Sequence, residues 1–295
     1  VCWNKFTASS YMWVILALTS ALLLGCYDIF KKMSVASNNV LGVLFWNTFF
    51  CALLLCPFII ADFINGTPVF DGNPTAHLHI LLKSAIVLVS WTLGYFSIKH
   101  LPLTISGPIS ATRPVLVLIG ALLIFSENLN MLQSFGVALG FFSLFFISRL
   151  GKKESSAPRT SMWLWMAVGA TLFGAVSALY DKYLLRIYEP IQVQAWYSLY
   201  QCIIMGTVIA IIRRFYAPAR NTPFRWRWTI PCIAVFLSAA DMAYFYALSD
   251  DSSMISVVSM IRRGSVIVSF AFGVIALHER HVKAKLLDLI ILLAG

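Results

Sequence analysis

The amino-acid sequence predicts an all-α membrane protein with ten transmembrane helices, which form two inverted repeats of five helices each. Three observations predict this fold class. The 295 residues are 60% hydrophobic and only 12% charged, with a mean hydropathy of +0.82, whereas a soluble domain carries about 25% charged residues. The apolar residues form consecutive runs of roughly the 20 residues that one membrane helix requires. The two halves of the chain also repeat several short motifs in the same order.

Breaks in the apolar runs delimit the ten expected helices. Several gaps are very short, such as Ser126-Glu127-Asn128, which predicts antiparallel neighbours. The last run is short for a membrane helix, and we therefore expect the natural protein to continue beyond Gly295. The expected helices cover residues 11–30, 38–61, 77–98, 102–125, 129–149, 161–184, 190–213, 228–248, 253–277 and 282–295.

A charged, Ser-containing stretch at residues 151–160 lies in the middle of the chain and is typical of a linker. It separates a first repeat, residues 1–150, from a second repeat, residues 161–295, whose last helix is incomplete. Each repeat holds five helices, an odd number, so the second repeat must enter the membrane from the opposite side. The matching motifs pair Tyr27-Asp28 with Tyr180-Asp181, Trp46 with Trp196, Gly94 with Ala243, Arg113 with Arg262 and Glu127 with Glu279.

Inverted repeats indicate a class of function. They are the architecture of alternating-access transporters, in which the substrate site lies near the membrane midplane where the two repeats meet. A channel, a structural membrane protein built by duplication, and a receptor that transports nothing are the alternatives. No nucleotide-binding loop, nucleophile motif or catalytic carboxylate pair is present, which disfavours an enzyme or an ATP-driven pump and predicts no cofactor.

The net charge of +10 comes mostly from Lys and Arg in the short gaps between apolar runs. Such clusters flank membrane helices on the cytoplasmic side, whereas a nucleic-acid surface requires a soluble basic face. We therefore expect the lipid bilayer, and not nucleic acid, as the partner of this charge. The richest gaps follow the first, third, fifth, seventh and ninth helices, which predicts that these gaps are cytoplasmic and both chain ends are outside.

Metal and disulfide sites are not indicated by the sequence. His77 and His79 form an isolated pair without a third ligand, and the six cysteines show no metal-binding spacing. The cysteines are expected to pack as small apolar residues.

Each half of the chain resembles the five-helix EamA repeat of the drug/metabolite transporter superfamily. The first helix carries LLLGCYDIFKK, and the stretch from Pro114 to Leu139 contains a helix that ends in Glu, a short polar turn and a Gly-containing apolar run. The second half repeats this pattern from Ser265 to Gly295. The resemblance implies a transporter, since relatives move amino acids, drugs, sugars, nucleotide sugars and sugar phosphates. It also implies cytoplasmic chain ends, in conflict with the distribution of positive charge.

Three arginines inside the expected helices are candidates for substrate binding. Charged groups in the bilayer are expensive and usually functional, and the planar guanidinium suits carboxylate and phosphate oxygens. Arg113 together with Arg262 or Arg263 could therefore form a cationic clamp around the negative group of a substrate. The sugar-phosphate exporters of the superfamily resemble this chain, because they also carry basic residues in their fourth and ninth helices. Adjacent helical residues point about 100° apart, so we expect one of Arg262 and Arg263 to reach the cavity and the other to pair or to extend to the interface.

In the alternative interpretation, each arginine pairs with an aspartate and only holds helices together. Asp241 lies deep in its expected helix and is the better candidate for an arginine partner. Asp28 and Asp181 lie near helix ends, where water can reach them, and are candidates for proton carriers or ion pairs.

Aromatic and amide side chains in the apolar runs complete the candidate site. A tyrosine hydroxyl surrounded by lipid requires a polar partner, so we expect mid-span tyrosines to face the cavity. The candidates are Asn47, Tyr95, Tyr180, Trp196, Tyr200 and Tyr244.

The sequence thus predicts a secondary active transporter or exchanger in a bacterial-type inner membrane, which moves a small anionic or zwitterionic organic solute. The alternative is an amino-acid or drug exporter whose arginines are structural. A proton or a counter-solute is the expected coupling partner, and the protein is expected to be a monomer or a homodimer.

Overall fold

The structure is a computed structural model, and it describes residues 12–35, 38–64, 74–100, 112–126, 162–215 and 223–265, with a few isolated positions between 109 and 138. All regular elements in these segments are α-helices. They are α2 (Met12–Val35), α3 (Val40–Ile64), α4 (Pro74–His100), α6 (Arg113–Ile124), α8 (Met162–Leu185), α9 (Pro190–Phe215), α10 (Thr229–Ser249) and α11 (Ile255–Arg263).

Six of these helices are long and apolar enough to cross a bilayer, namely α2, α3, α4, α8, α9 and α10. Each coincides with one of the expected helices, because a backbone within lipid must satisfy its hydrogen bonds internally and a helix does so. Proline is the first residue of α4 and α9 and the second residue of α6. The backbone N–H groups in the first turn of a helix have no partner within the helix, so the missing N–H of proline costs no hydrogen bond there. The expected helices at 129–149 and 282–295 lie outside the described segments.

The helices α6 and α11 fall within the fourth and ninth expected helices. The helix α6 begins at Arg113, directly after the N-cap Thr112, and most of residues 102–111 lies outside the described segments. The helix α11 ends at Arg263, Gly264 forms a turn, and residues 266–277 lie outside the described segments.

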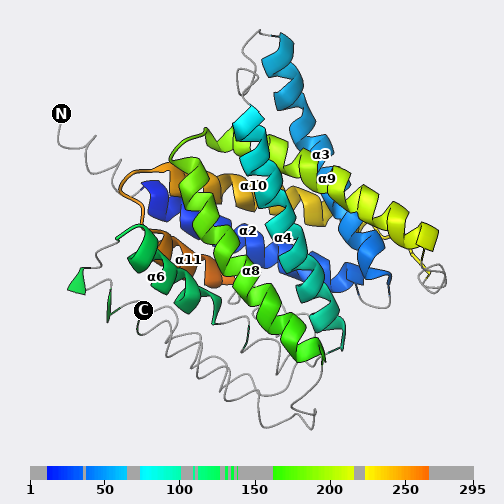
Figure 1. Ribbon diagram of the computed structural model, residues 1–295, viewed down its shortest axis with the longest axis horizontal. Helices are drawn as coiled ribbons and strands as arrows, with labels where there is room; N and C mark the ends of the chain where they lie inside the picture. The colour runs from blue at the N-terminus through cyan, green and yellow to red at the C-terminus, as the bar shows by residue number, and fades with distance from the viewer. Residues whose placement is uncertain are drawn as a thin grey trace.

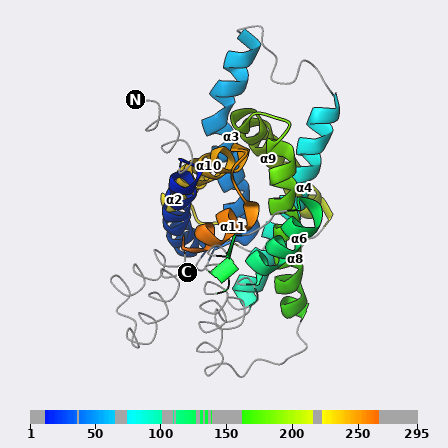
Figure 2. The same ribbon diagram turned by 90° about the vertical axis from the view of Figure 1, so that its left-hand side faces the viewer.

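The long helices pack in pairs that are distant in the sequence (Figure 1). The helix α2 lies along α10, α4 lies along α8, and α3 lies along α9. Figure 2 shows α2 with α10 on one side and α4 with α8 on the other, with α11 between them. Serine hydroxyls connect the first two pairs: Ser20 donates to the carbonyl of Ala240 and Ser90 to the carbonyl of Ala170, each at 2.7 Å. Small and hydroxylated residues allow such close approach of membrane helices.

Large apolar side chains cover much of the outer surface. Leu123 is 79% exposed and Trp165 is 71% exposed. A soluble protein rarely exposes contiguous apolar surface on this scale, whereas lipid tails cover it without loss. The protein is therefore a multi-pass membrane protein.

Candidate functional site

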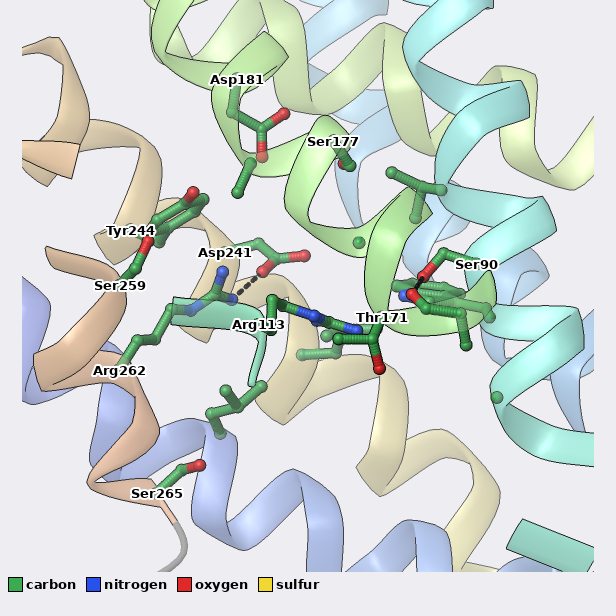
Figure 3. Close-up of a pocket in the computed structure, with 18 of the residues that line it drawn as sticks. Ser90, Arg113, Thr171, Ser177, Asp181, Asp241, Tyr244, Ser259, Arg262 and Ser265 are labelled. Carbon is green, nitrogen blue, oxygen red and sulfur yellow. Dashed lines mark hydrogen bonds and ion pairs between the residues drawn. The ribbon is translucent and has the colours of Figure 1, made fainter. Parts of the chain in front are cut away.

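A cavity of about 410 Å³ lies among the helix pairs and contains most of the charged side chains of the membrane region (Figure 3). The helices α2, α4, α6, α8, α9, α10 and α11 all contribute to its lining, whereas α3 does not. Among the described residues, five cationic side chains and three carboxylates line it, so this part of the lining carries two more positive than negative charges when fully ionised. These groups are Lys31, Lys83, Arg113, Arg262, Arg263, Asp28, Asp181 and Asp241.

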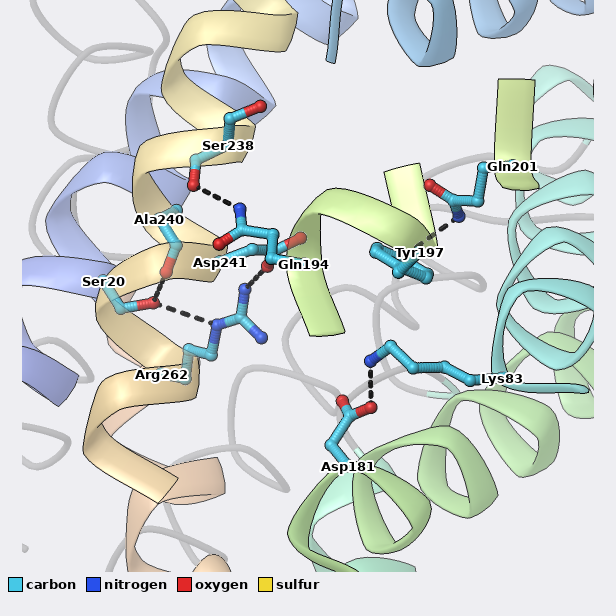
Figure 4. Close-up of polar contacts among 10 residues, drawn as sticks. All are labelled: Ser20, Lys83, Asp181, Gln194, Tyr197, Gln201, Ser238, Ala240, Asp241 and Arg262. Atoms are coloured by element: carbon cyan, nitrogen blue, oxygen red, sulfur yellow. Dashed lines mark hydrogen bonds and ion pairs between the residues drawn. The ribbon is translucent and has the colours of Figure 1, made fainter. Parts of the chain in front are cut away.

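Arg262 forms one of two ion pairs within the described segments, with Asp241 of α10 (Figure 4). Its Nε also donates to the Ser20 hydroxyl at 3.1 Å, and its guanidinium lies 4.0 Å from the ring centroid of Tyr244. The Ser20 hydroxyl in turn donates to the backbone of α10. Arg262 is therefore held in place from α2 and α10, and Asp241 is the arginine partner that the sequence favoured.

Lys83 of α4 forms the second ion pair, with Asp181 of α8 (Figure 4). The lysine is 1% exposed, and its Nζ lies 4.5 Å from the ring centroid of Tyr197 and 4.3 Å from that of Phe245. Asp181 is buried as well, so the expectation of a water-accessible helix end is wrong for it. Sequence reasoning missed Lys83, although a single lysine inside the expected helix 77–98 was a visible signal.

Arg113 is the first residue of α6 and extends against α8 (Figure 3). A side chain at Gly174 would meet Cζ, Nη2 and Nε of the guanidinium, so Arg113 occupies the space that this glycine leaves open. Among the described residues, its buried Nε has no hydrogen-bond partner, and no carboxylate lies within ion-pair distance of the guanidinium. An unpartnered charged donor is costly in a membrane interior, which suits a group whose partner arrives with the substrate.

Three more charged groups line the cavity without an ion pair in the described segments: Asp28, Lys31 and Arg263. The Lys31 ammonium lies 4.6 Å from the ring centroid of Tyr95 and 5.1 Å from that of Tyr27. Arg262 and Arg263 both line the cavity, which differs from the expectation that helical geometry would separate them. The two arginines are the last residues of α11, and Ser259 and Ser265 on either side of them in the sequence line the cavity as well.

The expected aromatic and amide groups divide into two sets. Tyr95 and Tyr244 line the cavity, whereas Asn47, Tyr180, Trp196 and Tyr200 lie outside it.

The second set makes its contacts elsewhere. The Tyr200 hydroxyl is 2.9 Å from Nδ1 of His77 on α4, and Trp196 packs edge-on against the same histidine. Tyr180 stacks on Tyr183 of its own helix, and Asn47 is fully buried beside Cys51 of its own helix. For Tyr200, a neighbouring helix thus supplies the polar partner that was expected from the cavity, whereas Nε1 of Trp196 and Nδ2 of Asn47 have no hydrogen-bond partner among the described residues.

Comparison with known proteins identifies the first half of the chain. The model of the EamA-like transporter family matches residues 11–149. Residues 11–149, somewhat less than half of the chain, are thus similar to the EamA-like transporter family. The similarity implies a membrane transporter of small solutes, and the proteins of that family are transporters rather than enzymes.

The fold of this chain is found in solved structures as well. A structure described as "Crystal structure of protein" is similar with a TM-score of 0.72 and 13% sequence identity, covering 96% of this chain and 94% of that chain. At this identity the similarity concerns the fold alone. No curated protein matches this chain.

Proposed function

We propose that the protein is a secondary active transporter or exchanger that moves a small organic anion across a bacterial-type inner membrane by alternating access. The observation that carries the proposal is the cavity charge, which has a surplus of two positive charges and includes an arginine, Arg113, without an ion pair in the described segments. Coupling to a proton or a counter-solute would supply the energy.

A two-repeat arrangement of ten helices underlies the proposed mechanism. In this arrangement, the helices α2, α3, α4 and α6 of the first repeat correspond in order to α8, α9, α10 and α11 of the second. The contact between α2 and α10 then has its counterpart in the contact between α8 and α4, and the contact between α6 and α8 has its counterpart in that between α11 and α2. The contacts α3–α9 and α6–α11 then correspond to themselves. Such a pattern is expected of two repeats related by a pseudo-twofold axis, which is the basis of rocking motions in transporters.

The chemistry of the cavity supports an anionic substrate. Arg113 and Arg263 stand at the beginning of α6 and the end of α11, and discontinuous helices are where transporters commonly bind their substrates. A carboxylate or phosphate could accept two parallel hydrogen bonds from either guanidinium. Tyr95 and Tyr244 line the same space and suit the apolar or hydroxylated remainder of an organic molecule.

The Arg262–Asp241 ion pair supports a second candidate, a zwitterion or cation exporter with structural arginines. In that case Asp28, which has no ion pair in the described segments, would bind the substrate's ammonium group. The two candidates differ in the charge of the ligand that stabilises the protein.

The melting temperature of the purified protein tests this choice. We expect organic phosphates or carboxylates to raise Tm, because a ligand that binds only the folded state stabilises it. Arg113→Ala and Arg263→Ala should weaken the apparent affinity at least about tenfold, whereas Arg214→Ala, an exposed arginine at the end of α9, should respond like wild type. Stabilisation by cations alone, or Arg113→Ala and Arg263→Ala variants that respond like wild type, would favour the exporter.

Uptake into proteoliposomes tests the mechanism separately. A transporter that alternates between two states shows saturable uptake of the stabilising anion. Flux that rises linearly with solute concentration would instead indicate a channel.

A further inference from the structure

Lys182 is a buried cation that plays no part in the cavity. It lies one turn before the C-terminal end of α8, next to the cavity residue Asp181, and is 2% exposed. Its side chain donates hydrogen bonds to the last turn of α10, the helix that carries Asp241, and to the connection, residues 250–254, that leads to α11.

Four oxygen atoms of the described segments lie within hydrogen-bonding distance of the Lys182 ammonium and share its three N–H donors. They are the carbonyl of Leu248 at 2.9 Å, the carbonyl of Asp250 at 3.3 Å, the carbonyl of Ser253 at 2.9 Å and the hydroxyl of Ser253 at 2.7 Å. None of these four oxygens belongs to a carboxylate. The carboxylate of Asp250 instead accepts hydrogen bonds from the backbone and hydroxyl of Ser252.

The backbone explains why these oxygens converge. The last carbonyls of a helix have no partner within the helix, and Leu248 lies in the last turn of α10. The chain then leaves the helix at Asp250, which has extended dihedral angles, and turns back so that Ser253 faces the helix end. The partial negative charge of the helix C-terminus adds to the attraction for a cation.

This arrangement has the chemistry of an alkali-ion site. In secondary transporters, the C-terminal ends of interrupted helices and carbonyls of unwound backbone hold the coupling ion. Oxygen distances of 2.7–3.3 Å around Nζ suit an ammonium ion or a large alkali ion such as K⁺ better than the smaller Na⁺. We propose that Lys182 is a tethered cation that occupies a monovalent-cation site between α10 and α11, and that removing its side chain opens this site to free K⁺ or NH₄⁺.

A lysine that only caps a helix would make some of the same hydrogen bonds. The two roles predict different results when the side chain is removed. A simple cap leaves carbonyls that water satisfies equally in every salt, whereas a cation site discriminates among ions. The inference does not depend on which solute the cavity binds, because its readout is stability rather than transport.

The test compares Tm in the chloride salts of choline, Na⁺, K⁺ and NH₄⁺ at one ionic strength. Wild type should melt within about 1 °C in all four salts, since its site is filled. Lys182→Ala should melt about 5 °C lower or more in choline chloride, and K⁺ or NH₄⁺ should restore about half of that loss or more. Lys182→Met, which keeps most of the side-chain volume without the charge, should be destabilised equally in all four salts.

A second variant and a second measurement keep the test decisive if Lys182→Ala folds poorly. Lys182→Ser offers a hydroxyl oxygen to an incoming ion and should show the same preference for K⁺ or NH₄⁺ over choline. For either variant, the fraction extracted from membranes as a monodisperse peak should be larger in KCl than in choline chloride. Equal Tm and equal recovery in all salts for both variants, or a Lys182→Met variant with the same ion response, would overturn the proposal.

Discussion

At the scale of single residues, Gly174 and Arg113 show how a small residue positions a charged one. The guanidinium of Arg113 lies against the backbone of α8, in the space where any other residue at position 174 would place its Cβ. A glycine inside a helix is otherwise unfavourable, by about 1 kcal/mol relative to alanine. Gly174 thus allows the arginine to lie flat against α8 while its charge lines the cavity.

Gly174→Ala should displace Arg113 without removing its charge. We expect the apparent Kd of a stabilising anion to rise roughly tenfold, which corresponds to about 1.4 kcal/mol, as measured from ligand-dependent Tm shifts. The matched control is Gly206→Ala, because a Cβ there would be 3.5 Å from the Phe45 ring, an ordinary contact. Equal anion affinity in the two variants would show that the position of Arg113 against α8 does not matter for binding.

At the scale of helices, the ion pair between Lys83 and Asp181 links α4 to α8. Both side chains are buried, and two aromatic rings surround the ammonium. A buried ion pair adds little net stability compared with apolar packing, but removing one partner leaves an isolated charge. The pair therefore determines that these two helices meet in one register.

A double-mutant cycle should reveal this coupling. Lys83→Met alone should lower the stability by about 3–5 kcal/mol, because Asp181 is then buried without its ammonium. Lys83→Met combined with Asp181→Asn should be more stable than the single lysine variant, since no buried charge remains. Tm measurements on the four proteins check this, and strictly additive effects would mean that the two groups do not interact.

Sequence patterns predicted the long helices well, because length and apolarity are what a bilayer requires. They predicted the arginines of the cavity for a related reason, since a charge in an apolar run is conspicuous. They did not distinguish Tyr95, which lines the cavity, from Tyr200, which lies outside it. The membrane helices are apolar on nearly every side, so periodicity does not reveal which face meets the cavity. The predicted extension of these helices over residues 102–111 and 266–277 stays a prediction, because most of these residues lie outside the described segments.

At the scale of the whole molecule, the basic gaps after the first and seventh expected helices lie together within the described segments. The Asn38 side chain joins the α2–α3 connection to the backbone of Arg225, with hydrogen bonds of 2.7 and 2.9 Å. Arg227 donates to the carbonyl of Met33 at the same place. This face therefore combines Lys31 with the arginines that flank the α9–α10 connection, and the positive-inside rule predicts that it is cytoplasmic.

Labelling of single cysteines in intact cells checks this orientation. In a background without the six native cysteines, Ile187→Cys in the α8–α9 turn should react with a membrane-impermeant maleimide. Arg214→Cys, at the basic end of α9, should react only after the cells are permeabilised. Both positions are exposed in the structure, so access differs only through the membrane. The reverse pattern would place the basic face outside, against the charge rule.

The unequal partners of Asp28 and Asp181 have a consequence for the kinetics of transport. The two aspartates occupy matching positions in the sequence, but only Asp181 has an ammonium partner in the described segments. If the alignment of Gly94 with Ala243 is extended along α4 and α10, the position that corresponds to Lys83 is Cys232, which cannot supply that charge. If the two repeats exchanged conformations during transport, Asp28 would therefore not form an ion pair equivalent to that between Asp181 and Lys83. The inward-open and outward-open forms would differ in free energy, and the Michaelis constant for the same solute would differ between the two sides of the membrane.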